Sequence, residues 1–147
     1  MLLLHSIKGV ELEFNIIKKL NKKQRKKLYK LYKKEWWTKD REKKDIKKML
    51  KNSDIIIGIT DENRKLIAFA RVLSDYIYKA EIYDVIVDTK YRHLGVGKLI
   101  MDNIINHKKL KKVKQFNLQC KKEMIPFYEK WGFKDTLELI YMRFVRD

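Results

Sequence analysis

Apolar and polar positions change period along the chain, and these changes divide it into predicted helices and strands. Leu12, Phe14 and Ile16 alternate with polar residues and predict a strand. Asn21 is a helix-capping residue type, and the spacing after it predicts a helix to about Trp37 and a second helix over about 40–51. The apolar face of the first helix is expected to comprise Leu28, Leu31, Tyr32 and Trp36.

Beyond residue 53 the pattern predicts mostly strands. Strands are expected over 54–60, 65–73, 80–87, 113–120 and 137–144, with helices over 98–107 and 124–131. Pro126 suits the first turn of the last helix and Gly132 its end. No linker or repeat interrupts this order, so we expect one domain over 1–147, of the α/β class with a mixed sheet.

The chain is strongly basic, with 36 Lys and Arg against 19 Asp and Glu and a net charge of +17. Anionic ligands, polyanions and acidic membrane surfaces suit such a charge. However, Lys far outnumbers Arg and accompanies frequent Ile and Asn, as an AT-rich coding sequence would produce. The lysines over 18–51 surround the predicted helices rather than forming a stripe, and no RNA- or DNA-binding motif is present. Nucleic acid is therefore not an expected partner.

Cysteine and histidine usage argues against a disulfide or a metal site. Cys120 is the single cysteine, and His5, His93 and His107 lack the spacing of metal ligands. No run of 18 apolar residues occurs, and the apolar start at 1–4 is too short for a signal-peptide core. We expect a reduced, cytoplasmic protein without a membrane partner.

The most informative segment, over 85–98, passes from a buried strand through a glycine-containing loop into a helix. Gly95 and Gly97 let the backbone N–H groups turn inward at the helix N-terminus, which is the geometry of a phosphate site. Arg92 and Lys98 would add positive charge at its rim. A glycine pair at this place is equally common in a simple tight turn, and the segment matches neither a Walker loop nor the dinucleotide fingerprint.

Two motifs resemble one family. Arg92-His93-Leu94-Gly95-Val96-Gly97 resembles the acyl-CoA pyrophosphate loop of the GNAT N-acetyltransferases, [RQ]-x-x-G-x-[GA], and residues 127–133 (FYEKWGF) resemble that family's late helix-to-strand signature. The resemblance implies a central, mostly antiparallel sheet flanked by about four helices, with acetyl-CoA as cosubstrate and a primary amine as acceptor. The cofactor-binding residues that it implies are Val85, Ile86, Val87, Arg92, His93, Leu94, Gly95, Val96, Gly97 and Lys98.

The resemblance also implies the catalytic groups. Tyr128 matches the family tyrosine that faces the CoA sulfur and is the expected general acid, although a tyrosine at this place also suits a packed core. Glu81 and Asp84 are the candidate general bases, and in a regular strand they would lie on opposite faces. The glutamate used by ribosomal-protein-type relatives is replaced by Phe116, and Lys121 or Lys122 stands where many members have a CoA-contacting asparagine.

The acceptor site is the least defined part of the resemblance. The substrate-binding candidates are Glu35, Trp36, Trp37, Arg71, Asp75 and Tyr83. Aromatic rings beside a carboxylate suit a cationic amine. The ordinary alternative is that one tryptophan belongs to the core and the other covers a helix end.

Two other functions stay open at this point. A non-catalytic acyl-CoA-binding module would bind CoA without turnover, and a basic nucleic-acid-binding protein would show tight, salt-dependent binding to polyanions. The sequence does not define the acceptor or the oligomeric state, and a homodimer remains open.

Overall fold

The computed structural model describes residues 2–7, 9–136 and 138–146. The strands are β1 (Leu2–Ile7), β2 (Val10–Ile17), β3 (Ile55–Thr60), β4 (Leu66–Ser74), β5 (Lys79–Val87) and β6 (Gln115–Asn117). The helices are α1 (Lys22–Lys34), α2 (Ile46–Lys51), α3 (Val96–Ile105) and α4 (Ile125–Glu129). Short 3-10 turns cover Lys43–Asp45, Thr89–Tyr91, Lys108–Leu110 and Lys122–Met124.

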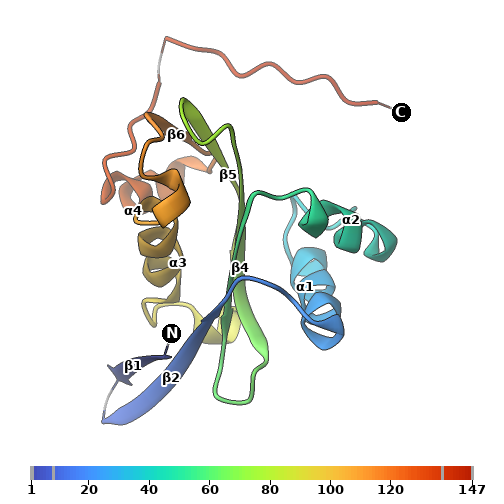
Figure 1. Cartoon of the computed structure of the whole chain (residues 1–147), viewed down its shortest axis with the longest axis vertical. Coiled ribbons are helices and arrows are strands. Elements are labelled where there is room, and N and C mark those ends of the chain that lie inside the picture. Colours follow the sequence, from blue (N-terminus) through green and yellow to red (C-terminus); the bar gives the residue numbers. More distant parts are fainter. Residues whose placement is uncertain (1, 8, 137, 147) are drawn as a thin grey trace.

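The strands form one sheet in the order β1-β2-β3-β4-β5-β6. Neighbouring strands are antiparallel except for β5 and β6, which are parallel and pair only from Lys79–Gln115 to Glu81–Asn117. Helices α1 and α2 cover one face of this sheet, and α3 and α4 cover the other (Figure 1). The sheet therefore separates two layers of helices.

Each face of the sheet has its own apolar cluster. On the α3 side, Ile100, Met101 and Ile104 pack with β-strand residues that include Ala80 and Ile82. On the α1 side, Leu28, Leu31 and Tyr32 pack with Phe69 and Ile86. Together these clusters bury the alternating positions that predicted the central strands.

Local signals in the sequence explain where the helices begin and end. Asn21 accepts a hydrogen bond from the Gln24 backbone N–H, and the Gln24 side chain accepts one from the Asn21 N–H, which confirms the predicted cap of α1. The helix ends at Lys34 because Glu35 is already extended. The prediction that α1 reaches Trp37 was therefore wrong, and Trp36 lies beyond the buried face of the helix.

The ends of the chain differ most from the predictions. The N-terminal hairpin of β1 and β2 includes a strand that was not predicted. The strand predicted over 113–120 is reduced to Gln115–Asn117. A closing strand was predicted over 137–144. Residue 137 lies outside the described residues, and the described residues 138–146 contain no strand because no neighbour among the described residues pairs with them.

Candidate active site

The loop between β5 and α3 presents free backbone donors at a helix N-terminus. His93 and Gly95 both adopt left-handed backbone conformations, with φ of 63° and 77°, and Gly95 is the N-cap residue of α3. Within the described residues, none of the backbone N–H groups of residues 93–98 reaches a protein acceptor. Such a run of donors, together with the positive end of the helix dipole, suits a phosphate or pyrophosphate.

The two charged residues at this loop are both held in place. Arg92 donates to the Val87 carbonyl at 3.2 Å and to Glu35 Oε1 at 2.7 Å, so it joins the loop to the end of α1. Lys98 pairs with Asp102 at 2.6 Å, one turn further along α3. Both cations therefore lie beside the free N–H groups but already have a carboxylate partner.

The two motifs that were separate in the sequence are in contact in the fold. A Cβ atom added at Gly97 would lie 3.2 Å from Phe127 Cζ, so the ring of α4 packs directly against the first turn of α3. The Trp131 indole N–H donates to Asp102 at 2.8 Å. Residues 127–133 thus pack against α3, the helix that follows the loop. A glycine suits position 97 because an aromatic ring occupies the space beside it.

Next to the loop, the side of β5 that faces β6 is unpaired beyond Glu81; this open strand side is called the slot below. Their pairing ends at Glu81 and Asn117, so in the described part of the chain Val85, Ile86 and Val87 have no strand partner on the β6 side. On the other side, Ile86 and Val87 pair with β4. An open strand side can hydrogen-bond an extended ligand that carries amide groups.

Tyr128 lies in α4 and belongs to the apolar cluster on this face of the sheet. Its side chain is 8% exposed, and its ring contacts the Phe127 and Phe133 rings edge-on, with centroids 5.0 and 6.2 Å away. Burial, with a smaller effect of Cys120, raises the Tyr128 pKa to about 12. Its hydroxyl group makes no hydrogen bond within the described residues, and no buried side-chain polar atom there lacks a partner, so the hydroxyl oxygen keeps access to solvent or a ligand as a protonated donor.

A β-bulge places both candidate carboxylates on the same face of the sheet. Ala80 and Ile82 face the α3 layer, whereas Ile86 faces the α1 layer, so the alternation reverses between them. The register with β4 shifts at this place, and Asp84 has a φ of 58°. The expectation that Glu81 and Asp84 lie on opposite faces assumed a regular strand and is wrong for this reason.

Asp84 is the centre of a buried ion cluster. Its carboxylate accepts hydrogen bonds from Tyr32 Oη and Arg71 Nε at 2.8 Å each, and from both terminal nitrogens of Arg41. Burial alone would raise the Asp84 pKa, but the hydrogen bonds and charges of Arg41 and Arg71 outweigh it and lower the pKa. Tyr32 and Arg41 gave no functional signal in the sequence, because one follows the core pattern of a helix and the other lies in a charged connection.

Glu81 has a different environment. It lies half-buried where β5 and β6 part, and one carboxylate oxygen accepts from the Asn117 side-chain amide at 2.5 Å. No cation contacts this carboxylate within the described residues. Glu81 therefore keeps one oxygen free at the edge of the slot.

The acceptor candidates are only partly brought together. Trp36 and Trp37 are 60% and 44% exposed, so neither is a core residue. The alternative that one of the two tryptophans belongs to the core is therefore wrong. The Arg71 guanidinium lies 4.8 Å from the centroid of the Tyr83 ring, on the same face as Asp84. Asp75 lies apart in the β4–β5 turn, where its carboxylate accepts from the backbone N–H groups of residues 77–79.

Lys121 is one of the two lysines that stand where many members of the resembling family have an asparagine. Its ammonium group lies 5.2 Å from the centroid of the Trp36 ring, so the segment before α4 contacts the segment after α1 across the end of the sheet. Together with the Arg92–Glu35 pair, this contact connects the two helical layers near the loop.

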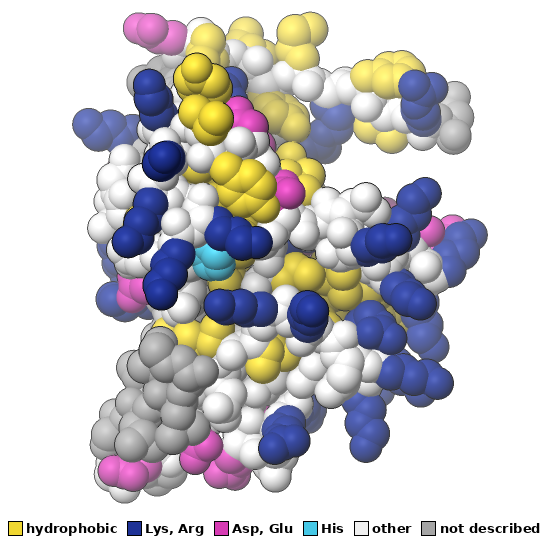
Figure 2. All heavy atoms as spheres, viewed as in Figure 1, with side chains coloured by type: hydrophobic (Ala, Val, Ile, Leu, Met, Phe, Trp, Pro, Cys, Tyr) yellow, Lys and Arg dark blue, Asp and Glu magenta, His cyan; other side chains and the backbone are white. Residues whose placement is uncertain are grey.

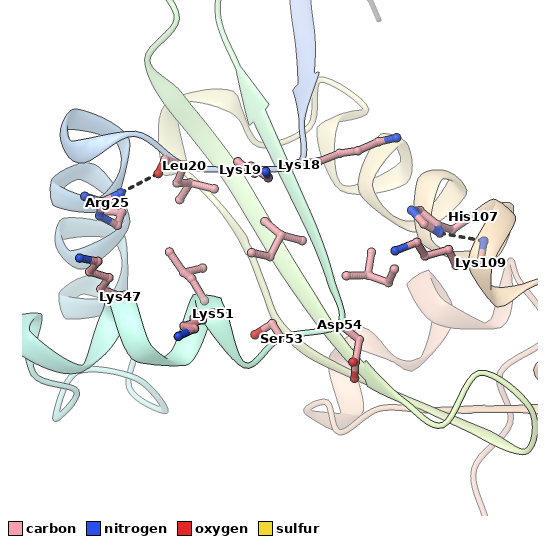
Figure 3. Close-up of a pocket in the computed structure, with 13 residues that line it drawn as sticks. Lys18, Lys19, Leu20, Arg25, Lys47, Lys51, Ser53, Asp54, His107 and Lys109 are labelled. Carbon is pink, nitrogen blue, oxygen red and sulfur yellow. Dashed lines mark hydrogen bonds between the residues drawn. The ribbon is translucent and has the colours of Figure 1, made fainter.

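A hollow of about 530 Å³ lies at the opposite end of α3. Its floor contains Leu20, Leu50, Ile55 and Ile56, and its charged lining includes Lys18, Lys19, Arg25, Lys47, Lys51 and Lys109 (Figure 3). It lies where β2 ends at Ile17, opposite Gly58, so that the start of β3 pairs with β4 but not with β2. Basic side chains also cover much of the surrounding face (Figure 2), so the lysines of this hollow continue the general charge of the molecule.

The described residues offer neither a metal cluster nor a membrane-spanning helix. No group of three or more His, Cys, Asp or Glu side chains among them could hold a metal ion. In that same part of the chain, no helix is both long and apolar enough to cross a bilayer.

With the fold and the loop described, the family can be stated. Residues 17–146 match the acetyltransferase (GNAT) domain, and the chain belongs to this family. A GNAT-family protein from Xanthomonas campestris has the same fold, with a TM-score of 0.78 and 26% identity over 90% of this chain and 93% of that one. The predicted GNAT-type mixed sheet is thereby confirmed.

Curated relatives are similar over part of the chain. The uncharacterized N-acetyltransferase ycf52 of Pyropia yezoensis is 36% identical over 100 residues, which is 66% of this chain and 57% of that protein. The chloroplastic GCN5-related N-acetyltransferase 1 of Arabidopsis thaliana is 29% identical over 85 residues, 57% of this chain and 43% of that protein. The chain thus spans about half the length of the curated relatives that it matches.

A further solved structure has the fold together with the cosubstrate. A Clostridium acetobutylicum protein solved with acetyl-CoA has a TM-score of 0.66 and 21% identity, over 88% of this chain and 96% of that one. At this identity the likeness concerns the fold.

Proposed function

We propose that this chain transfers an acetyl group from acetyl-CoA to a primary amine while both are bound. The observation that carries the proposal is the run of free N–H groups over residues 93–98, next to the open side of β5. The N–H groups suit the CoA pyrophosphate, and Val85 to Val87 suit the amide groups of the pantetheine arm.

The reaction makes two demands on proton transfer. The amine nitrogen forms a bond to the acetyl carbon, the carbon–sulfur bond breaks, the amine loses a proton and the CoA thiolate gains one. An alkylamine with a pKa of about 10.4 is only about one part in 2,500 neutral at pH 7, so a base or a water chain must deprotonate it. The departing sulfur needs a protonated donor nearby.

Tyr128 is the proposed donor to the sulfur. Its hydroxyl group stays protonated up to a pH of about 12 and has no protein partner to displace within the described residues. Its place in α4, beside Phe127 and therefore beside Gly97, brings it close to the loop. The interaction would strengthen as charge develops on the sulfur, which is the condition for lowering the barrier.

Glu81 is the better of the two candidate bases. It has a free oxygen where the slot begins, whereas the Asp84 carboxylate is occupied by Tyr32, Arg41 and Arg71 and is a weak base. We therefore assign Asp84 a positioning role for the two arginines. The exposed Trp37 ring suits an amine that arrives as a cation, beside Glu35, whose Oε1 already accepts from Arg92.

The test measures acetyl-CoA binding by calorimetry and release of free CoA thiol with a panel of amines. Gly95→Leu should abolish binding, because the side chain would occupy the space in front of the N–H groups. Gly9→Leu is the matched control, since Gly9 has a similar φ of 79° but lies in open space. Binding without thiol release across the panel would favour the non-catalytic module, and unchanged binding by Gly95→Leu would remove the loop from the site.

A further inference from the structure

The sheet is open at a second place, where β2 and β3 separate. These strands pair only from Asn15–Thr60 to Ile17–Gly58, so among the described residues no strand lies on the β2 side of residues 55–57. On their other side the same residues pair with β4. The hollow of about 530 Å³ lies at this open side of β3 (Figure 3). An open strand side can hydrogen-bond an extended ligand that carries amide groups.

Local contacts fix the separation of the two strands. At their last pair, a Cβ atom added at Gly58 would lie 2.7 Å from Ile17 Cγ1, so the strands are tightly packed up to this point. Further along, the Leu20 carbonyl accepts from Arg25 Nη1 at 2.8 Å, and Asn21 caps α1. The segment after β2 is therefore anchored to α1 and does not follow β3.

Both helical layers border the open strand. Ile55 belongs to the apolar cluster on the α3 side, and Ile56 packs against the cluster on the α1 side. The side chains of an added strand would face the two layers in the same alternation. Leu20 and Leu50 provide buried apolar surface on the α1 side. Three residues of a strand span about 10 Å, so the hollow suits the apolar centre of a short peptide segment.

The rim of the hollow carries an excess of positive charge. Asp54 is the only described carboxylate in the lining, and it accepts from the Ser74 backbone N–H at 2.8 Å. The general charge of the molecule explains why lysines lie on the surface, but not why they surround an apolar floor beside unpaired backbone. Five exposed lysines line the hollow, and none of them is ion-paired within the described part of the chain: Lys18, Lys19, Lys47, Lys51 and Lys109.

We propose that the hollow binds an acidic, extended segment of a partner protein, which adds to β3 as a short strand. The backbone amides of the segment pair with residues 55–57, its apolar side chains contact Leu20 and Leu50, and its carboxylates lie among the lysines of the rim. This binding does not depend on the proposed acetyl transfer, because the hollow and the candidate acyl-CoA site lie at opposite ends of α3.

A peptide suits the hollow better than other anionic partners do. Phosphate groups and fatty acids have no amide groups to pair with the open side of β3. The described lining has no Phe, Tyr or Trp ring on which a nucleic-acid base could stack. A bilayer surface is broad and flat, whereas the hollow is recessed between two helical layers (Figure 3). Carboxylates carried on an extended backbone match both the charge and the open strand.

The test is fluorescence anisotropy of the labelled, end-blocked peptide Glu-Glu-Ile-Val-Ile-Glu-Glu with the full chain at 150 mM salt. The blocked N-terminus prevents the peptide from serving as an acetyl acceptor. Saturable binding is expected, and Lys47→Glu/Lys51→Glu should weaken it at least about tenfold, because two attractive charges become repulsive. The control Lys30→Glu/Lys48→Glu makes the same change in net charge at exposed lysines outside the hollow and should alter the dissociation constant less than about twofold. Melting curves of both variants check the fold.

Methylation of the peptide backbone tests strand pairing separately from charge. In an added strand, successive N–H groups point alternately toward the sheet edge and away from it. An N-methyl group at the central valine or at the isoleucine after it should therefore abolish binding at one of the two positions and not at the other. Equal effects at both positions would show attraction by charge alone and would overturn the proposal.

His107 provides a readout at the hollow itself. Burial, together with the charges of Lys18 and Lys109, lowers the His107 pKa. Peptide carboxylates would offset these charges, so the His107 pKa measured by NMR should rise on binding, while the His93 resonances should not shift. The proposal would be wrong if millimolar peptide gave no saturable binding, if both lysine pairs gave an equal loss, or if a single-stranded oligonucleotide or phosphatidylserine vesicles bound more tightly at the same lysines.

Discussion

At the scale of single residues, the structure explains why one tyrosine can be both a core residue and a proton donor. Tyr128 is almost fully buried, yet its hydroxyl group faces no protein acceptor in the described part of the chain. The sequence presented packing and acid catalysis as alternatives, whereas the geometry is compatible with both. The ring provides the packing, and in the proposed mechanism the hydroxyl group donates the proton.

Replacing Tyr128 by Phe is therefore expected to separate the two roles. The ring and its contacts remain, so the melting temperature and the acetyl-CoA dissociation constant should change little. The loss of the proton donor should lower kcat by about 100- to 1,000-fold, in the lower half of the range for general acid catalysis because a thiol leaves readily. Steady-state kinetics beside a melting curve provide the measurement, and wild-type kcat with normal stability would contradict the assignment.

The raised pKa of Tyr128 gives a prediction for the pH profile. An ordinary tyrosine would lose its proton near pH 10, but burial moves this loss to a pH of about 12. Because the proton must be present for the acid role, kcat should not decline between pH 9 and roughly 11. A descending limb centred near pH 10 that disappears in Tyr128→Phe would show an exposed hydroxyl group instead.

Asp84 gives a prediction about stability. Its folded pKa is lowered, so its stabilising effect is present above the ordinary aspartate pKa of about 3.9 and is lost as the pH falls through the folded value. Asp84→Asn leaves two arginines near a neutral partner and should lower the free energy of unfolding by about 3 kcal/mol at neutral pH. This value is at the low end of the range for breaking a buried ion pair because Arg41 is partly exposed. Urea unfolding from pH 7 to 3 should show the difference from the natural chain shrink below pH 4; a constant difference would contradict the ionic account.

At the scale of elements, the contact between α3 and α4 connects the candidate pyrophosphate loop to Tyr128. Gly97 leaves just enough room for the Phe127 ring, with 3.2 Å between a hypothetical Cβ and Cζ. This contact was absent from the sequence reasoning, because each motif was identified by itself. Helix periods and glycine positions predict where helices begin, but not which ring lies against which glycine.

The packing of Phe127 against Gly97 can be tested by a pair of compensating substitutions. Gly97→Ala should move Phe127 by a few tenths of an ångström, destabilise the fold by about 1 kcal/mol and weaken acetyl-CoA binding several-fold. Adding Phe127→Leu to Gly97→Ala should restore part of both losses by making room for the methyl group. Thermal unfolding and calorimetry of the two single variants and the double variant measure the coupling. Strictly additive effects would mean that the two elements do not constrain each other.

The elements also show how far the sequence could predict the fold. The central strands and α3 were predicted because their buried faces have a clear period, and Asn21 correctly marked the start of α1. The bulge at Asp84 could not be predicted, because alternation assumes one residue per pleat and aspartate at a positive φ has no sequence signal of its own. The exposed Trp36 was misplaced because an amphipathic pattern does not fix the last turn of a helix.

At the scale of the whole molecule, the positive charge is spread over both ends of α3. The basic hollow lies at the helix C-terminus, and the candidate acyl-CoA site lies at its N-terminus. A ten-residue helix is about 15 Å long, which exceeds the screening length of about 8 Å at physiological salt. The lysines of the hollow should therefore have little influence on the bound cosubstrate.

Neutralising three of these lysines tests that separation. Lys18→Gln, Lys47→Gln and Lys51→Gln together should leave the acetyl-CoA dissociation constant within about twofold at 150 mM salt. Lys27, a lysine of α1, is left unchanged because its ammonium group pairs with the buried Asp88 carboxylate at 2.5 Å. Calorimetry in 20 and 150 mM salt provides the comparison. A tenfold loss of affinity at the higher salt concentration would mean that the hollow takes part in cofactor binding.

The short parallel pairing of β5 with β6 has a consequence for how the slot behaves before a ligand arrives. The wall formed by β5 belongs to a sheet region that is paired over many residues. The wall formed by β6 is attached only through three residue pairs and the contacts of α4. The second wall should therefore open locally far more often than the first. In hydrogen exchange, amides over 115–133 should exchange orders of magnitude faster than those of β4 and become protected when acetyl-CoA bridges the two walls. The cosubstrate would then act as a structural clasp as well as an acetyl donor.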